Sequence, residues 1–234
     1  MNLEKTLIGI LFVFSFFLFW FASAEKTETK TVFVERVIDG DTVQLNDGSK
    51  VRFLGINTPE TNMFLYGEAK NFTNSLIENK TIRLESTETD KYGRHLGYIF
   101  LGDENVNLEI LKAGFAHLYY YGTDKYYDSF KNAEENARES EKGIWKRSEN
   151  YGCINLVKFV YLDLTEKDKE LLILKNGCNV DLTLTIKDDA THIYKEKISA
   201  GKTFEKETQN IWNDDGDSIY IWDSSGLIFF YRYP

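Results

Sequence analysis

Three short stretches of this sequence carry polar side chains whose types and spacing could do chemistry. They read VIDGDTVQL, RFLGINTPE and DKYGRHLGYIF, at residues 37–45, 52–60 and 90–100. Arginine stays protonated and can neutralise the charge that builds on a phosphodiester when water attacks it. A carboxylate can take the proton of that water, and a hard cation on oxygen ligands can bind a phosphate oxygen. The side chains that could supply these parts are Asp41, Arg52, Glu60 and Arg94.

Each stretch also has an interpretation without chemistry. Asp-Gly-Asp is a common turn, Thr-Pro-Glu often starts a helix, and an arginine in a strand can pair with a nearby carboxylate. Strict alternation along a strand even puts Arg52 and Asn57 on opposite faces. A bulge or strong twist near Gly55 is needed to bring these two side chains together.

The elements that must position these residues are short strands and a few helices. Residues 31–56 alternate apolar and polar side chains in three runs, with a hairpin turn at 46–49. A helix follows, with Ala69, Phe72 and Leu76 on one face. Two further strands and two further helices are predicted at 80–86, 96–101, 105–114 and 128–143. The fold class is therefore mainly β with α, and the count predicts a five-stranded closed barrel of the oligonucleotide/oligosaccharide-binding (OB) type with three helices.

The pattern of apolar and polar residues changes near residue 150. From there on, six strand-like runs are separated by turn signals, and no helical period appears. This pattern predicts a small β-sandwich. The expected organisation is a barrel domain at 25–150 and a sandwich domain at 151–234.

The first 24 residues belong to neither domain. Residues 7–24 form an uncharged run of 18 residues that ends in Ala22-Ser23-Ala24. The ending fits a cleaved signal peptide, whereas the length is close to that of a membrane anchor. Both interpretations send the remaining chain across a membrane, so we expect a secreted or membrane-anchored protein that faces outside the cytoplasm.

Export makes a disulfide between the two cysteines, Cys153 and Cys178, chemically permissible. The alternative is a pair of free buried thiols. The three histidines, His95, His117 and His192, are scattered and are interpreted as structural or solvated. The net charge is −9, which disfavours tight binding to a long polyanion but leaves room for a local phosphate site.

Taken together, the three polar stretches resemble the staphylococcal-nuclease (thermonuclease) family over roughly residues 31–148, because DGDTVQL, R-x4-NTPE and DKYGRHLGYIF match its signatures in order and spacing. The family fold is a five-stranded barrel with three helices. The resemblance implies catalytic roles for Arg52, Glu60 and Arg94. It implies a calcium site made by Asp41, Asn57 and the Thr58 carbonyl, and nucleotide contacts by Lys91, Tyr92 and Tyr120. Three consecutive tyrosines at 119–121 leave the register of Tyr120 open.

One residue departs from the family pattern. The family usually has aspartate where this chain has Asn57. An amide oxygen can coordinate calcium but brings no charge, so we expect weaker calcium binding than at a site with two aspartates. The alternative is that Asn57 only caps the turn before Pro59.

The C-terminal part resembles a lamin tail domain over roughly residues 155–234, and this resemblance implies an immunoglobulin-like β-sandwich. Its stretch DGDSIYIWDSSG at 215–226 echoes DGDTVQLNDG at 39–48, but no arginine and Thr-Pro-Glu turn follow it. We interpret Asp217 as part of a turn that enters a strand rather than as a second metal site.

These observations predict an exported, monomeric, calcium-dependent phosphodiesterase: an endonuclease acting on DNA and also on RNA. The alternative is a non-catalytic module on the same barrel that binds nucleic acid or protein at the cell surface. A third interpretation makes the C-terminal sandwich the working part of a surface protein.

Overall fold

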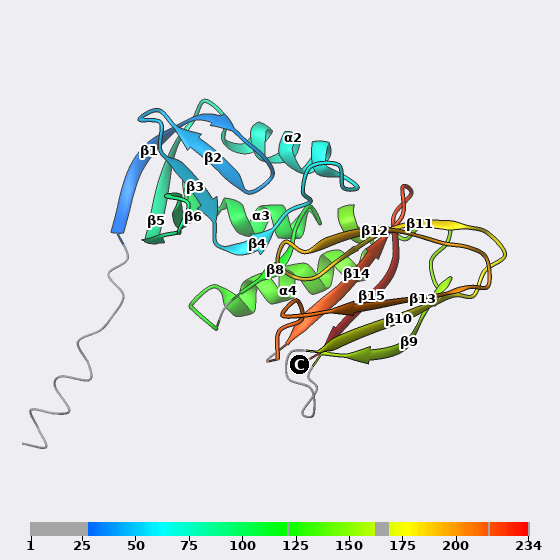
Figure 1. The fold of residues 1–234 in the computed structure, drawn as a ribbon. Helices are drawn as coiled ribbons and strands as arrows, with labels where there is room; N and C mark the ends of the chain where they lie inside the picture. The colour runs from blue at the N-terminus through cyan, green and yellow to red at the C-terminus, as the bar shows by residue number, and fades with distance from the viewer. Residues whose placement is uncertain (1–27, 121, 162–168, 215, 234) are drawn as a thin grey trace, which may run out of the picture.

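The computed structural model describes residues 28–120, 122–161, 169–214 and 216–233 (Figure 1). The expected signal peptide or anchor at 1–24 lies outside these residues. In the part of the chain that the structure describes, no helix has the length and apolar character needed to cross a membrane.

The N-terminal part contains a closed five-stranded barrel (Figure 1). Its strands follow the order β3-β2-β1-β5-β6, and β3 closes the barrel by pairing in parallel with β6. A two-residue strand, β7, extends the sheet at β6, and a separate ribbon joins β4 to β8. The strands are β1 Glu28–Val37, β2 Thr42–Leu45, β3 Lys50–Phe53, β4 Gly55–Asn57, β5 Thr81–Thr89, β6 His95–Leu101, β7 Glu104–Asn105 and β8 His117–Tyr119. The predicted barrel is confirmed.

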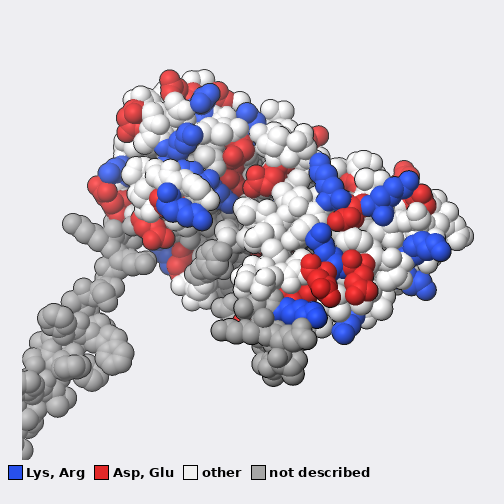
Figure 2. Space-filling model, in the orientation of Figure 1, with Lys and Arg blue, Asp and Glu red and all other residues white. Residues whose placement is uncertain are grey.

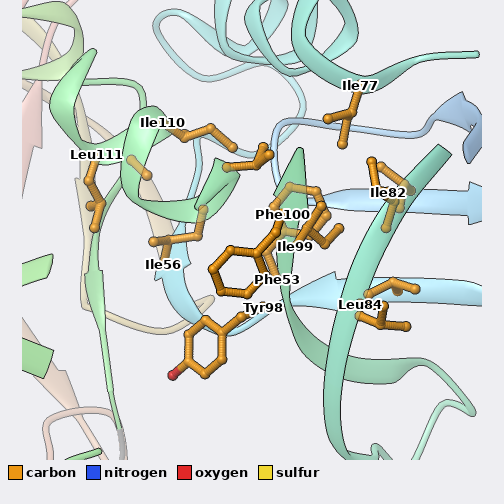
Figure 3. Close-up of a cluster of buried hydrophobic side chains, with 14 of the residues drawn as sticks. Phe53, Ile56, Ile77, Ile82, Leu84, Tyr98, Ile99, Phe100, Ile110 and Leu111 are labelled. Atoms are coloured by element: carbon orange, nitrogen blue, oxygen red, sulfur yellow. The ribbon is translucent and has the colours of Figure 1, made fainter. Parts of the chain in front are cut away.

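Three α-helices pack on the barrel, as predicted: α2 Tyr66–Ile77, α3 Val106–Lys112 and α4 Tyr127–Glu139, followed by the short 3-10 helix η1 Gly143–Trp145. Apolar side chains of strands and helices point toward one another in a common core, among them Phe53, Ile82, Ile99 and Ile110 (Figure 3). On α2 the fully buried residues are Ala69, Thr73 and Ile77, while Phe72 and Leu76 are partly buried against the core. The buried face of α2 is therefore rotated slightly from the predicted one, toward Thr73 and Ile77.

The C-terminal part consists of two antiparallel sheets, ordered β13-β10-β9 and β12-β11-β14-β15. Their strands are β9 Ile154–Val160, β10 Glu170–Asn176, β11 Leu182–Lys187, β12 Ile193–Ile198, β13 Thr203–Thr208, β14 Asp217–Trp222 and β15 Leu227–Tyr233. Leu172 and Leu174 of the first sheet share one core with Ile186 and Ile219 of the second. Two sheets around one core are what a sandwich requires, whereas its immunoglobulin-like topology stays a prediction.

Strand β13 was not among the six predicted strands of this part. Its sequence, TFEKET, alternates exposed and half-buried residues at the edge of its sheet, so it carries no apolar run that would have indicated a strand. Asp217, in contrast, behaves as predicted for a turn that enters a strand. Its carboxylate accepts hydrogen bonds from the backbone amides of Asp189, Asn213 and Ser218.

A disulfide joins Cys153 to Cys178, with the Cα atoms 5.2 Å apart. It links the residue before β9 to the loop after β10, two neighbouring strands of one sheet. The described residues contain no free cysteine.

The C-terminal sheets pack directly against the helical side of the barrel (Figure 1). A third apolar cluster combines Ile144 and Trp145 with Tyr220, Trp222 and Leu227 from β14 and β15. Beside it, Arg232 forms a bidentate ion pair with Glu134, a residue of α4 that is fully buried; the two N–O distances are 2.6 and 3.1 Å. The two parts therefore share an extensive, partly apolar contact.

Candidate active site

A break in one strand brings the predicted site residues together. Gly55 has φ of +78°, which ends β3 and starts β4 on a new course. A Cβ at this position would lie 2.5 Å from the Tyr120 ring and 2.9 Å from the Phe130 ring, so both conformation and space require glycine. As a result Arg52 and Asn57 face each other, with Nη2 of the arginine donating to Oδ1 of the amide at 3.1 Å.

The guanidinium of Arg52 is held on several sides. Its Nε lies 3.1 Å from Oδ1 of Asp41, and both side chains are largely buried. Its Nη1 donates to the backbone carbonyls of Phe53 and Ile56. Arginine has five N–H donors, and these contacts together with Asn57 use four of them. Among the described residues, one Nη2 hydrogen has no partner and could bind a ligand, and the contacts of the other donors fix the position of this guanidinium.

Asp41 is the centre of this cluster. Its Oδ2 accepts from the amide and the hydroxyl of Thr58, at 2.8 and 2.9 Å. Gly40 makes this approach sterically feasible, because a Cβ there would lie 2.6 Å from the Thr58 hydroxyl. Burial, and after it the charge of Asp41, raises the pKa of neighbouring Asp39 to about 6. Negative charge is thus concentrated at the start of β2.

The oxygen atoms of this cluster are suitable ligands for a hard cation, but few of them carry a charge. Asp41 supplies a carboxylate and Asn57 an amide oxygen. Against this, the oxygens of Asp41 already accept from Thr58 and Arg52. The described residues contain no cluster of three or more His, Cys, Asp or Glu side chains suited to a metal. A cation here would have few charged ligands and would compete with Arg52.

The amide nitrogen of Asn57 has a different partner, which sequence reasoning missed. It donates to the backbone carbonyls of Asp189 and Ala190, at 3.0 and 2.7 Å, in the turn between β11 and β12. Only the nitrogen can donate, so these contacts fix which way the amide faces. Asn57 is 2% exposed and does not act as a local cap of the turn before Pro59.

Arg94, Lys91 and Tyr92 lie together in the turn between β5 and β6. Because β6 runs parallel to β3, with Leu96 opposite Arg52, this turn lies near the N-terminal end of β3. The Arg94 guanidinium is ion-paired with Asp90 at 2.7 Å. The Tyr92 ring is 72% exposed and flanked by both cations, with its centroid 5.1 Å from Lys91 Nζ and 5.6 Å from Arg94 Cζ. These residues form an exposed cationic and aromatic surface, separate from the Asp41 cluster in the contacts described.

The two remaining predicted site residues, Glu60 and Tyr120, make contacts other than those of the Asp41 cluster. Glu60 is half-buried, and its carboxylate interacts electrostatically with Lys187 on β11. The Tyr120 hydroxyl is bound to Tyr98 and Asp124, at 2.8 and 3.0 Å. The residue lines a cleft of about 760 Å³ between the barrel and the C-terminal sheets. Tyr120 is therefore anchored by its hydroxyl and by ring contacts with Tyr127 and Phe130 at the border of this cleft.

Charged side chains of both signs are interspersed on the face shown in Figure 2, without one dominant basic surface. On this face, an anionic ligand would therefore depend on individual cations rather than on an extended basic surface. Arg52 is such a cation, fixed beside the carboxylate of Asp41 on a strand of the barrel.

Comparison with known proteins agrees with this class of fold. The model for "Staphylococcal nuclease homologue" matches residues 50–147. The thermonuclease of Staphylococcus intermedius is 38% identical over 137 residues, which cover 53% of this chain and 82% of that protein. The thermonuclease of Staphylococcus hyicus is 36% identical over 136 residues, 53% of this chain and 80% of that protein. Endonuclease YncB of Bacillus subtilis is 33% identical over 140 residues, 54% of this chain and 66% of that protein.

The chain therefore belongs to the staphylococcal-nuclease family. The family match ends at residue 147 and does not reach the C-terminal sheets.

Proposed function

We propose that this protein is a nuclease that hydrolyses phosphodiester bonds in DNA and RNA. The observation that carries the proposal is the preset guanidinium of Arg52, which within the described part of the chain keeps one N–H donor unpaired beside Asp41 and Asn57. The thermonuclease and endonuclease names of its relatives support the same reaction.

In the proposed reaction, Glu60 accepts a proton from the attacking water as the new P–O bond forms. Arg52 donates to the phosphate oxygens, where negative charge builds in the transition state, and Arg94 joins it after exchanging Asp90 for phosphate. The bond to the 5′ oxygen breaks, that oxygen takes a proton from solvent, and a 3′-phosphate remains. Tyr92 and Tyr120 offer ring faces to the bases, and Lys91 offers a charge to a phosphate.

We further propose that calcium is the cofactor, held by Asp41, Asn57 and the Thr58 carbonyl. Bound calcium would supply positive charge to the phosphate and lower the pKa of a bound water. The affinity should be low, because Asp41 is the one charged ligand in this set, and an exported enzyme can work with a weak site. Export, attachment through residues 7–24, a monomeric state and a lamin-tail-like C-terminal domain belong to the same proposal.

The test is cleavage of single-stranded DNA by the purified protein, with calcium or with a calcium chelator, beside Glu60→Gln. We expect calcium-dependent cleavage that falls by roughly 10²–10⁴ in the variant, as is typical for loss of a general base. Glu68→Gln, an exposed glutamate on α2, is the matched control and should cleave like the wild type. Binding without cleavage at every calcium concentration would instead support the non-catalytic module.

A further inference from the structure

Lys187 is a buried lysine at the end of β11, in the C-terminal part of the chain, and it lies against the barrel. It is 1% exposed, and its ammonium has three acceptors: the carbonyls of Asp188 and Ala190 and Nε2 of His117. An ammonium has three N–H donors, so all are used. Retaining a buried charge is costly unless its hydrogen bonds are complete, and here they are.

His117 connects this lysine to the site. Asn57 on β4 pairs directly with His117 on β8. Nδ1 of His117 donates to the carbonyl of Leu118, which leaves Nε2 as the acceptor for Lys187 at 3.3 Å. Burial, reinforced by the Lys187 charge, lowers the pKa of His117, so the ring is neutral as this arrangement requires.

The carbonyl of Ala190 is shared by the two side chains. It accepts from the Lys187 ammonium and from the Asn57 amide nitrogen. The lysine thereby ties together two carbonyls of the turn at residues 188–192, the turn that presents the Asp189 and Ala190 carbonyls to Asn57. Contacts of Asp188 with His192 and of Asp189 with Asp217 hold the same turn from its other side.

We propose that Lys187 is a positioning residue for the phosphodiester-cleaving site. It fixes the turn that holds the Asn57 nitrogen, and this keeps the amide oxygen facing Arg52. This inference rests on the proposed function. It also explains the amide at position 57, because a carboxylate could not donate to the two carbonyls that the C-terminal sheets bring there.

The rest of the contact between the two parts does not depend on Lys187. The apolar cluster around Trp145 and Trp222 and the buried Glu134–Arg232 ion pair hold the C-terminal sheets in place. Replacing the lysine by methionine, which has a similar length, should therefore loosen the turn without separating the two parts.

The experiment uses the full chain in four forms: wild type, Lys187→Met, Asn57→Ala and the double variant. The control is Lys195→Met, which removes an exposed lysine that reaches the carbonyl of Asn62 at 3.4 Å. Two quantities are measured for each form: kcat and KM on single-stranded DNA, and hydrogen exchange of the Asn57 side-chain amide by NMR, with exposed Asn132 as reference.

We expect Lys187→Met to lower kcat roughly tenfold with KM within about twofold, because it disturbs orientation rather than substrate contact. The double variant should be no worse than Asn57→Ala, since both changes act through one side chain. The Asn57 amide should exchange slowly in the wild type and quickly in Lys187→Met. Lys195→Met should match the wild type in every measurement.

Additive losses in the double variant, or a wild-type kcat in Lys187→Met, would overturn the proposal. Fast exchange of the wild-type Asn57 amide would also overturn it, and that measurement needs no variant. Because exchange is read without substrate, it tests the contact even where no cleavage is found, and failure of the nuclease proposal stays distinguishable.

Discussion

We expect the substitution Asn57→Asp to have opposite effects on two properties: it should lower the stability of the protein and raise its affinity for calcium. The amide at this position is 2% exposed and makes two hydrogen bonds to the turn between β11 and β12. A carboxylate loses both, at about 1 kcal/mol each, and sets a negative charge against two carbonyl oxygens. The Lys187 ammonium, which binds the same Ala190 carbonyl, and the Arg52 guanidinium, which donates to Oδ1 of residue 57, offset part of that charge. We expect a net loss of about 2–4 kcal/mol without calcium, or about 4–16 °C in Tm for a chain of this size.

Calcium should act in the opposite direction. A carboxylate at position 57 adds a second charged ligand beside Asp41, and calcium affinity rises with the number of charged ligands. We expect the calcium concentration for half-maximal cleavage to fall roughly tenfold. A ligand that binds only the folded state also raises its stability, so millimolar calcium should narrow the difference in Tm between the two proteins.

The assay is a calcium titration of Tm and of cleavage rate for the wild type, Asn57→Asp and Asn62→Asp. Asn62 is an exposed residue of the neighbouring loop and controls for the added charge. An unchanged Tm without calcium would show that the amide does not hold the turn in solution. An unchanged calcium midpoint would show that residue 57 is not a calcium ligand.

Three further outcomes are expected. Replacing Cys153 and Cys178 by serine should lower the free energy of unfolding by about 3 kcal/mol, because the disulfide closes a ring over a sequence separation of 25. Mass spectrometry of the non-reduced wild type should show no free thiol. Arg232→Met leaves the fully buried Glu134 without its cation and should cost about 3 kcal/mol in denaturant unfolding, much of it recovered in the double variant with Glu134→Gln. Asp39 has a folded-state pKa raised from 3.8 to about 6, so its contribution to stability is complete below about pH 4 and is lost as the pH rises through 6; Asp39→Asn should gain stability relative to the wild type over that range.

The barrel could be predicted because its signals are local. Alternating strands, the turn at Gly48 and the helical period of α4 each depend on residues that are close in sequence. The required break near Gly55 could also be stated in advance, since two polar residues five positions apart cannot share a strand face without one. The charged edge strand β13 gave no such signal, and its place depends on pairing with β10.

The same reasoning explains which parts of the site could not be predicted. Asp41, Arg52, Asn57 and Glu60 are recognisable as a set because they lie in two short motifs close together in the sequence: Asp41 directly before β2, and the other three along β3, β4 and the turn that follows. The turn that binds Asn57 lies 132 and 133 residues further along the chain, and Lys187 follows Leu184 and Ile186 in a strand whose own pattern predicts a solvated lysine. That lysine is buried because the barrel covers its face, which is a property of the packed molecule rather than of either segment. The amide at position 57 lies within the nuclease motif, but its two hydrogen-bond acceptors come from the C-terminal sheets.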